Sequence, residues 1–389
     1  MKLLPFDYAV RNLGRSPVRL MALVAGHMLV VMLVLAAASF VRGMQASLGG
    51  GGSQHHVLLL SAGSEESIER SQIDAGTVGV IRASLPHVRR SGGEPHLSPE
   101  VLTSLIVRTG KDSPIELRAM LRGITPGAFL VHERVEIIEG RAPVDGRNEL
   151  LVGNLADAML GLPARRLEPG NSLWFDGHEW LIVGRFRAAN SVMQGEIWTS
   201  LRDLQVATRR EAVSCVVVEL TEPEAFADID MFAKMRVDLE LAAVRETTYY
   251  GALQQFYRPV RWMIWATACM AALAGVLGGL NTMYAAFAAR IRELGMLQAL
   301  GYPRRAIIIS LVQESLLTAA VASLLACALG AWLMQGVAVR FSMGVLELRP
   351  DAPALMLAAG IGLLLGVFGA LPPALRCLRA AIPQALKAV

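Results

Sequence analysis

Long uncharged stretches lie near both ends of the chain and enclose a region that is rich in charge. The first runs from 20 to 41, and the others run from 262 to 289, from 306 to 339 and from 352 to 375, with Glu314 as the only charged residue inside them. At about 1.5 Å per helical residue, each is long enough to cross a bilayer core of about 30 Å. The pattern predicts four transmembrane helices.

Most charged residues fall between 53 and 258, where short apolar runs alternate with turn residues. Val57 to Leu60 is typical of a buried strand, and Leu173 to Val183 predicts a hairpin that turns at Asp176-Gly177. Helices are expected in three segments, near 64–70, 154–160 and 223–239. We therefore predict a membrane protein with four transmembrane α-helices in a 1+3 arrangement and a large α+β extracytoplasmic domain inserted between helices 1 and 2.

Basic residues cluster before the first uncharged run, between the second and third, and after the fourth. They are Lys2, Arg11, Arg15, Arg19, Arg290, Arg292, Arg304, Arg305, Arg376, Arg379 and Lys387. Because loops rich in Lys and Arg stay in the cytoplasm, both termini are expected inside and the domain outside. A cleavable signal peptide is the alternative for the first run, which is overlong for that purpose and lacks a clean cleavage site.

These patterns divide the chain into segments of distinct character. The expected segments are a cytoplasmic amphipathic helix (1–17), a first transmembrane helix (18–41), a glycine-rich linker (42–52), an extracytoplasmic domain with a stalk helix at its end (53–258), a second transmembrane helix (259–289), a cytoplasmic elbow (290–305), a third transmembrane helix (306–339), an outside loop (340–351), a fourth transmembrane helix (352–375) and a cytoplasmic tail (376–389).

The composition agrees with a membrane protein. Hydrophobic residues make up 53% of the chain and charged residues 18%, which is too apolar for an ordinary soluble protein of this size. The formal net charge of +4 comes with no nucleic-acid-binding motif, so we expect no nucleic acid as a partner. Of the four cysteines only Cys215 falls in the domain, which excludes an internal disulfide there.

No segment carries the motif of an enzyme. A nucleophile elbow is absent, and Gly110-Lys111 lacks the spaced glycine and the following Ser or Thr of a phosphate-binding loop. The pair His55-His56 has no cysteine or carboxylate at ligand spacing, so no metal site is predicted. We expect no catalytic residues and no cofactor bound directly by this chain.

Two features of the predicted membrane helices stand out. Glu314 is a carboxylate inside the third helix, where it needs a partner or a hydrated cleft; it is either a coupling contact near the cytoplasmic side or a satisfied interface residue. Small residues recur at four-residue spacing, including Gly275 with Gly279 and Gly362 with Gly366. Such stripes let helices approach closely, either within one chain or across a dimer seam.

The segment 290–317, which reads RIRELGMLQALGYPRRAIIISLVQESLL, resembles the signature segment of the FtsX-like permease family, which includes the MacB and LolC/LolE proteins. Residues 8–19 are similar to the amphipathic helix with which this family begins, and 374–386 are similar to its closing motif. The stretch 170–186 resembles a strand pair of the MacB-type periplasmic domain. Unlike MacB, this sequence has no fused ATPase domain.

The resemblance implies the permease subunit of an ABC transporter of the mechanotransmission type, in the bacterial inner membrane, with 53–258 in the periplasm. It implies an ABC ATPase subunit that binds ATP and Mg²⁺, a second permease copy or paralogue, and a periplasmic adaptor with an outer-membrane channel. The ATPase would move the periplasmic domain, and this motion would drive export or the release of lipoproteins or lipids. Two alternatives stay open: an FtsX-like regulator that activates an extracytoplasmic hydrolase or sensor, and a membrane-anchored receptor without an ATPase.

Within the resemblance, the elbow between the second and third transmembrane helices is the expected ATPase contact. Residues 290–300 should continue the second helix into the cytoplasm, with Gly301 ending it in the left-handed conformation and Pro303 starting the next helix. Apolar residues there should be covered by the ATPase or, alternatively, by Phe6 and Val10. The expected coupling residues are Glu293, Leu294, Gly295, Met296, Leu297, Leu300, Gly301 and Tyr302.

Overall fold

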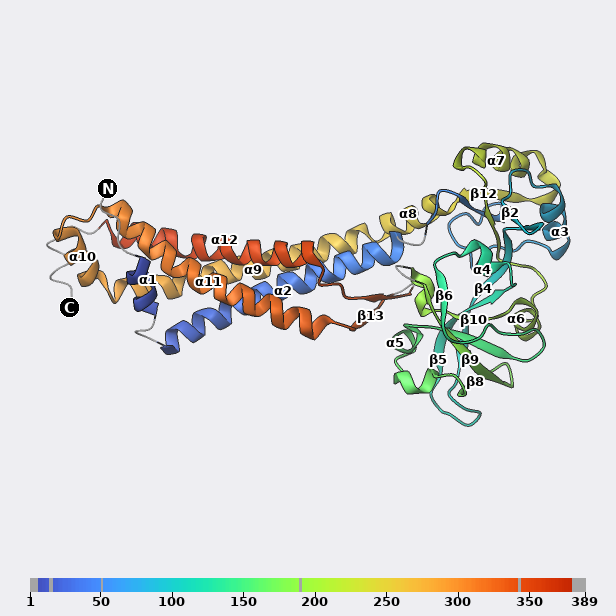
Figure 1. Cartoon of the computed structure of the whole chain (residues 1–389), viewed down its shortest axis with the longest axis horizontal. Coiled ribbons are helices and arrows are strands. Elements are labelled where there is room, and N and C mark those ends of the chain that lie inside the picture. The colour runs from blue at the N-terminus through green and yellow to red at the C-terminus, as the bar shows by residue number, and fades with distance from the viewer. Residues whose placement is uncertain (1–5, 14–16, 50–51, 189–190, 342–343, 380–389) are drawn as a thin grey trace. The chain divides into compact units, whose positions relative to one another are not determined.

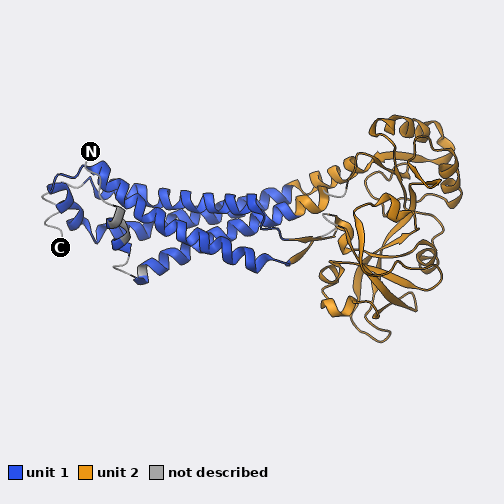
Figure 2. Ribbon diagram, in the orientation of Figure 1, with its two compact units in different colours: residues 1–43, 259–337, 348–389 blue, residues 44–258, 338–347 orange. Residues whose placement is uncertain are grey.

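The computed structural model describes residues 6–13, 17–49, 52–188, 191–341 and 344–379. The chain divides into two compact units, which Figure 2 shows in different colours. Unit 1 contains Met1–Gly43, Pro259–Val337 and Leu348–Val389, and unit 2 contains Met44–Arg258 and Ala338–Glu347.

Unit 1 is built from helices (Figure 1). They are α1 (Phe6–Leu13), the first part of α2 (Pro17–Gly49), α9 (Arg258–Ala288), α10 (Ile291–Ala299), α11 (Arg304–Met334) and α12 (Ala352–Cys377). Among the described residues, four helices are long and apolar enough to cross a membrane: Leu20–Gly49, Arg258–Ala288, Arg304–Met334 and Ala352–Cys377. This confirms the prediction of four helices of membrane-spanning length and composition.

The helices of unit 1 pack through small and branched apolar side chains. Val31, Leu35 and Ala38 of α2 are buried against Ala326 of α11 and Ala358 of α12. A second cluster joins α2, α9, α10, α11 and α12; its buried members are Leu23, Met283, Ala286, Phe287, Leu294, Ile307, Leu311, Ala370, Ala374 and Leu378. In contrast, α9 buries few of its side chains in this chain, and most of its length is exposed.

The predicted glycine-rich linker at 42–52 is wrong over 42–49, because α2 continues as a helix to Gly49. Met44 and Leu48 are buried along this last part of the helix. Methionine, glutamine, alanine and leucine are good helix formers, and here they outweigh the glycines at 43 and 49. Residues 50–51 of the expected linker lie outside the described residues.

The third predicted transmembrane helix ends too late at 339. Helix α11 ends at Met334, and Gly336 has a φ of +73°, a left-handed conformation that does not continue an α-helix. Half of the expected outside loop at 340–351 lies in paired strands, in which β13 (Ala338–Phe341) pairs antiparallel with β14 (Gly344–Glu347). Helix α12 extends two residues beyond the predicted end at 375.

Unit 2 is an α/β domain around one long mixed sheet. The strand order is β12-β1-β11-β4-β5-β10-β7-β9-β6, and β8 pairs with β9 off this path. Two pairs, β5 with β10 and β7 with β9, are parallel, and the others are antiparallel. The strands are β1 (His56–Ser61), β4 (Leu97–Val107), β5 (Leu117–Ile124), β6 (Val135–Gly140), β7 (Glu149–Gly153), β8 (Ser172–Phe175), β9 (His178–Ala188), β10 (Ile197–Ser200), β11 (Cys215–Glu219) and β12 (Leu241–Arg245).

Short helices cover the sheet of unit 2. They are α3 (Ala75–Ser84), α4 (Ala128–Val131), α5 (Ala156–Leu160), α6 (Leu201–Thr208), α7 (Phe226–Met235) and α8 (Glu246–Phe256). A small separate pair joins β2 (Arg90–Ser91) to β3 (Glu94–Pro95). Apolar residues of alternate strand positions form the largest buried cluster, which includes Val57, Leu121, Val152, Trp180 and Val216.

Four local predictions for this domain are confirmed and one is wrong. Val57 to Leu60 forms the buried part of β1, and β8 and β9 form the predicted hairpin, with Asp176 and Gly177 at positive φ of 49° and 73°. Helices occur at α5 and α7, as expected. The helix predicted at 64–70 is a series of turns, because Ser64, Ser67 and Arg70 each donate a backbone N–H to the carbonyl three residues earlier.

Candidate functional site

The elbow of unit 1 is the short helix α10, which lies between the ends of α9 and α11. Its end is as predicted: Gly301 has a φ of +88°, and the N–H of Tyr302 donates to the carbonyl of Leu297. Pro303 then precedes α11 in an extended conformation. The start is not as predicted, because Arg290 has a φ of −118° and ψ of 15° and separates α10 from α9.

The elbow buries one side and exposes the other. Leu294 and Gly295 are buried, and Leu297 and Tyr302 are partly buried against the apolar cluster of unit 1. Met296 is 49% exposed and Leu300 72% exposed. The expectation that a partner covers all the apolar elbow residues is therefore wrong for Leu294, which packs within its own chain.

The remaining expected coupling residues lie around this surface. The Glu293 carboxylate is partly buried, with its Oε2 3.5 Å from Nε of Arg290. Gly301 is exposed at the tip of the turn. The alternative, in which Phe6 and Val10 cover the elbow, concerns side chains that lie outside the described residues.

Glu314 has partners, as the sequence required of a carboxylate in a membrane helix. It is 6% exposed and accepts a hydrogen bond from the side-chain amide of Asn12. Nη1 of Arg290 donates to both of its oxygens at 3.3 and 3.2 Å. These contacts stabilise the charge at a depth where an isolated carboxylate is costly. Asn12, on α1, is itself buried.

The small residues have two different environments. A Cβ added to Gly275 would lie 2.5 Å from Val30, and one added to Gly366 would lie 2.5 Å from Ala319. At Gly362 it would clash with Ser323 and Val31. At Gly279 it would meet nothing within 4 Å. The first three glycines therefore serve packing inside this chain, while Gly279 faces outward.

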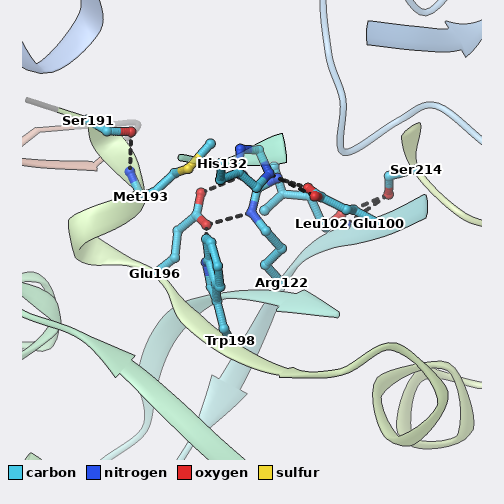
Figure 3. Close-up of polar contacts among 9 residues, drawn as sticks. All are labelled: Glu100, Leu102, Arg122, His132, Ser191, Met193, Glu196, Trp198 and Ser214. Carbon is cyan, nitrogen blue, oxygen red and sulfur yellow. Dashed lines mark hydrogen bonds and ion pairs between the residues drawn. The ribbon is translucent and has the colours of Figure 1, made fainter. Parts of the chain in front are cut away.

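A buried ionic quartet in unit 2 consists of Glu100, Arg122, His132 and Glu196 (Figure 3). Arg122 on β5 donates from Nη1 to Glu100 on β4 at 2.6 Å, and from Nε and Nη2 to the two oxygens of Glu196 at 2.7 Å each. Nε2 of His132 lies 2.8 Å from Glu100, and the indole N–H of Trp198 donates to Glu196 at 2.8 Å. All four charged residues are at most 6% exposed.

The charged groups of this quartet stabilise the ionised forms of their neighbours. Burial raises the pKa of Glu100, but His132 and Arg122 outweigh it and hold that pKa at about 2. Burial lowers the pKa of His132, but the carboxylate of Glu100 overcomes it, so the pKa of His132 is raised. With His132 protonated, the two positive and two negative charges balance.

Helix α8, in the place where a stalk was expected, is anchored beside this quartet. Glu246 at its first turn lies 2.8 Å from Nδ1 of His56 and accepts the backbone N–H of Ser53 at 3.0 Å. The hydroxyl of Tyr249 accepts the N–H of Ile68 at 3.4 Å. Nδ1 of the adjacent His55 lies 3.4 Å from the backbone carbonyl oxygen of Leu220. No group of three or more metal-ligating side chains occurs among the described residues.

The sequence did not predict the partners of Glu314 or those of the charged residues in the ionic quartet. Asn12 and Arg290 could not be assigned to Glu314 without knowing that their segments meet. The quartet left a weak signal, since Glu100 is the one charged residue of β4 and Arg122 lies between apolar residues of β5. Such positions are expensive to bury unpaired, so each predicts a partner without naming it.

Comparison with known proteins addresses the membrane part directly. Residues 265–382 match the family model of the FtsX-like permease C-terminal domain. Over these residues, the chain is similar to the FtsX-like permease family. The match includes α10, α11, α12 and most of α9, and it confirms the resemblance drawn from 290–317.

Two solved structures are similar to part of this chain. The periplasmic region of MacB from Actinobacillus actinomycetemcomitans aligns at 11% identity and a TM-score of 0.40, covering 53% of this chain and 95% of that one. The extracellular domain of the noncanonic ABC-type transporter YknZ from Gram-positive bacteria aligns at 14% identity and a TM-score of 0.36, covering 49% and 99%. A search of curated protein sequences found no match.

Proposed function

We propose that this chain is the permease subunit of a mechanotransmission ABC transporter, in which a separate ATPase moves the membrane helices and thereby the extracytoplasmic domain. The observation that carries the proposal is an exposed apolar pair, Met296 on α10 and Leu300 directly after its end, inside the segment that matches the permease family. Apolar side chains at a turn between two membrane helices are unfavourable in water, so a protein partner that covers them stabilises the complex.

The proposed arrangement follows the charge pattern and the family. Both termini and α10 are cytoplasmic, residues 53–258 are periplasmic, and the four helices cross the inner membrane in a 1+3 order. ATP and Mg²⁺ bind to the ATPase subunit and not to this chain. A second permease copy or a paralogue completes the complex, and a periplasmic adaptor or a lipoprotein substrate engages the outer domain.

The test is the recovery of ATPase activity with the full-length protein. The tagged chain is purified in detergent from the membranes of its source cells, and vanadate-sensitive ATP hydrolysis is measured together with photolabelling of the eluted polypeptides by azido-ATP. We expect hydrolysis and a labelled polypeptide separate from the permease. The variants Met296→Asp and Leu300→Asp should lose both, while Val206→Asp, which changes an equally exposed apolar residue of unit 2, should retain them.

The size of the effect follows from the exposed area. Full burial of such side chains contributes about 1.5 to 3 kcal/mol each. Scaled by their exposed fractions of 49% and 72%, Met296 and Leu300 together contribute about 2 to 4 kcal/mol, or about 20- to 500-fold in affinity. Normal ATPase recovery in both Asp variants would refute the elbow as the contact. Recovery of an extracytoplasmic hydrolase or a sensor in place of an adaptor would favour the regulatory function.

A further inference from the structure

Three segments that are far apart in the sequence meet at one carboxylate in unit 1. Asn12 comes from α1, Arg290 from the break between α9 and α10, and Glu314 from α11. Tyr8, one turn before Asn12 on α1, also interacts with the guanidinium of Arg290. Figure 1 shows α1 and α10 beside the same end of α11. We call Asn12, Arg290 and Glu314 the polar clasp.

The geometry of Arg290 explains why the helix breaks where it does. Its guanidinium reaches back to Glu314 on α11, 24 positions further along the chain, and its own backbone leaves the helical region. The break between α9 and α10 therefore lies at the residue that contacts Glu314.

The same guanidinium is shared between the elbow and the membrane helix. Nη1 lies 3.2 and 3.3 Å from the oxygens of Glu314, and Nε lies 3.5 Å from Glu293 on α10. These distances exceed the roughly 2.7–2.9 Å of strong charge-assisted hydrogen bonds. Nη2 is buried and has no hydrogen-bond partner among the described residues. Arg290 is thus bonded at once to a carboxylate of the elbow and to a carboxylate of α11.

We propose that the polar clasp transmits displacement of the elbow to α11 and α1. This inference rests on the proposed function, since it assumes that the ATPase contacts α10. When the ATPase moves α10, Glu293 moves relative to Arg290. The guanidinium then moves closer to one of the carboxylates of Glu293 and Glu314 and farther from the other. Because Glu314 also holds Asn12, the change reaches both α11 and α1. Arg290 and Glu314 are positioning residues in this scheme and do not contact the ATPase themselves.

A purely structural role for the clasp makes a different prediction. If Glu314 only needs a neutralising partner, its removal should lower the stability of the bundle and leave coupling intact in the molecules that fold. If the clasp transmits motion, ATPase binding should persist while the response of α11 is lost. The substitution Glu314→Gln suits this comparison, because it keeps the shape and an acceptor for Asn12 but removes the charge that holds Arg290.

The experiment uses the full chain purified with its ATPase. Cys269, Cys327 and Cys377 are replaced by alanine, and a spin label is attached to a cysteine at Leu324, which is 72% exposed on α11 and ten positions beyond Glu314. Spectra are recorded with and without ATP, Mg²⁺ and vanadate. Glu314→Gln and Arg290→Gln should retain ATPase recovery and lose the ATP-dependent spectral change by about fivefold or more, the lower end of allosteric coupling.

Two further variants keep the test decisive. Arg290→Lys retains the positive charge but not the planar set of donors, so it should keep more of the ATP-dependent spectral change than Arg290→Gln. This comparison does not depend on whether Glu314→Gln folds. Asn281→Ala removes an exposed amide from α9 and should behave as the wild type. A full spectral response in the clasp variants would overturn the inference and leave the proposed function standing. Absence of ATPase in the wild-type preparation would refute the proposed function, and this role with it.

Discussion

Removing Arg122 should open unit 2 far more than removing any exposed arginine. The side chain is 3% exposed and is bonded to two carboxylates, Glu100 and Glu196, that are themselves buried. The substitution Arg122→Met keeps most of the volume and leaves two negative charges without their main partner. Breaking a buried ion pair in this way costs about 3 to 5 kcal/mol.

The buried thiol of Cys215 provides an assay in the intact protein. It is fully buried in unit 2, and burial raises its pKa, so it reacts with a maleimide only when the domain opens. With the cysteines of unit 1 replaced by alanine, the labelling rate reports this opening. A cost of about 3 to 5 kcal/mol corresponds to labelling that is about 150- to 5,000-fold faster.

A matched control separates this effect from the loss of any positive charge. Arg236 pairs with Asp238 at 2.7 Å, but the two side chains are 39% and 61% exposed, so solvent screens the pair. Arg236→Met should therefore change the labelling rate far less than Arg122→Met does. The triple variant Glu100→Gln, Arg122→Met, Glu196→Gln should recover part of the stability, because it removes the unpaired charges. Equal rates for Arg122→Met and Arg236→Met would refute the quartet as a source of stability.

Three other predictions follow from the structure and the charge pattern. Burial lowers the pKa of His132 and Arg122 opposes its charge, but Glu100, supported by Glu246, raises that pKa above its ordinary value. The stabilisation from protonated His132 is therefore complete below the ordinary histidine pKa and is lost as pH rises through the raised value. The urea midpoint of unit 2 should fall over this range, and a His132→Gln variant that shows the same fall would contradict the prediction. Lys111→Cys should react with an impermeant maleimide in intact spheroplasts, and protection there would contradict the proposed topology. Gly366→Ala should lower the thermal stability of the purified protein, because the added methyl group would meet Ala319. Gly279→Ala should leave the stability unchanged, because its methyl group would meet nothing in this chain. Equal melting temperatures of the two variants would contradict the packing of α11 on α12.

The sequence predicted the features that depend on local composition. Uncharged runs located the four long helices, because a bilayer requires about 20 apolar residues in succession. Asp176 and Gly177 located a hairpin turn, because few other residue pairs tolerate two positive φ angles. Gly301 located the end of the elbow for the same reason. In each case the physical cause lies within a few residues of the predicted feature.

The features that escaped prediction depend on contacts between distant segments. The break at Arg290 results from a carboxylate on another helix, and nothing in the neighbouring residues indicates it, since the local sequence is compatible with a continuous helix. The ionic quartet requires that β4 and β5 pair in one particular register, which sets Leu102 opposite Arg122 and brings Glu100 within reach of its guanidinium. Neither register nor helix packing can be read from a single sequence.

The two polar centres share a physical design that bears on motion. Each holds an arginine between two carboxylates on different elements, but the bonds of Arg122 measure 2.6 to 2.7 Å and those of Arg290 measure 3.2 to 3.5 Å. Short bonds in a dry core resist rearrangement, whereas long, shared bonds permit it at small cost. Breaking the contacts of Arg122 would leave buried charges without partners, so the strands that carry Glu100 and Arg122 should keep their relative positions under an applied displacement. Deformation should concentrate in unit 1, at the clasp between α1, α10 and α11.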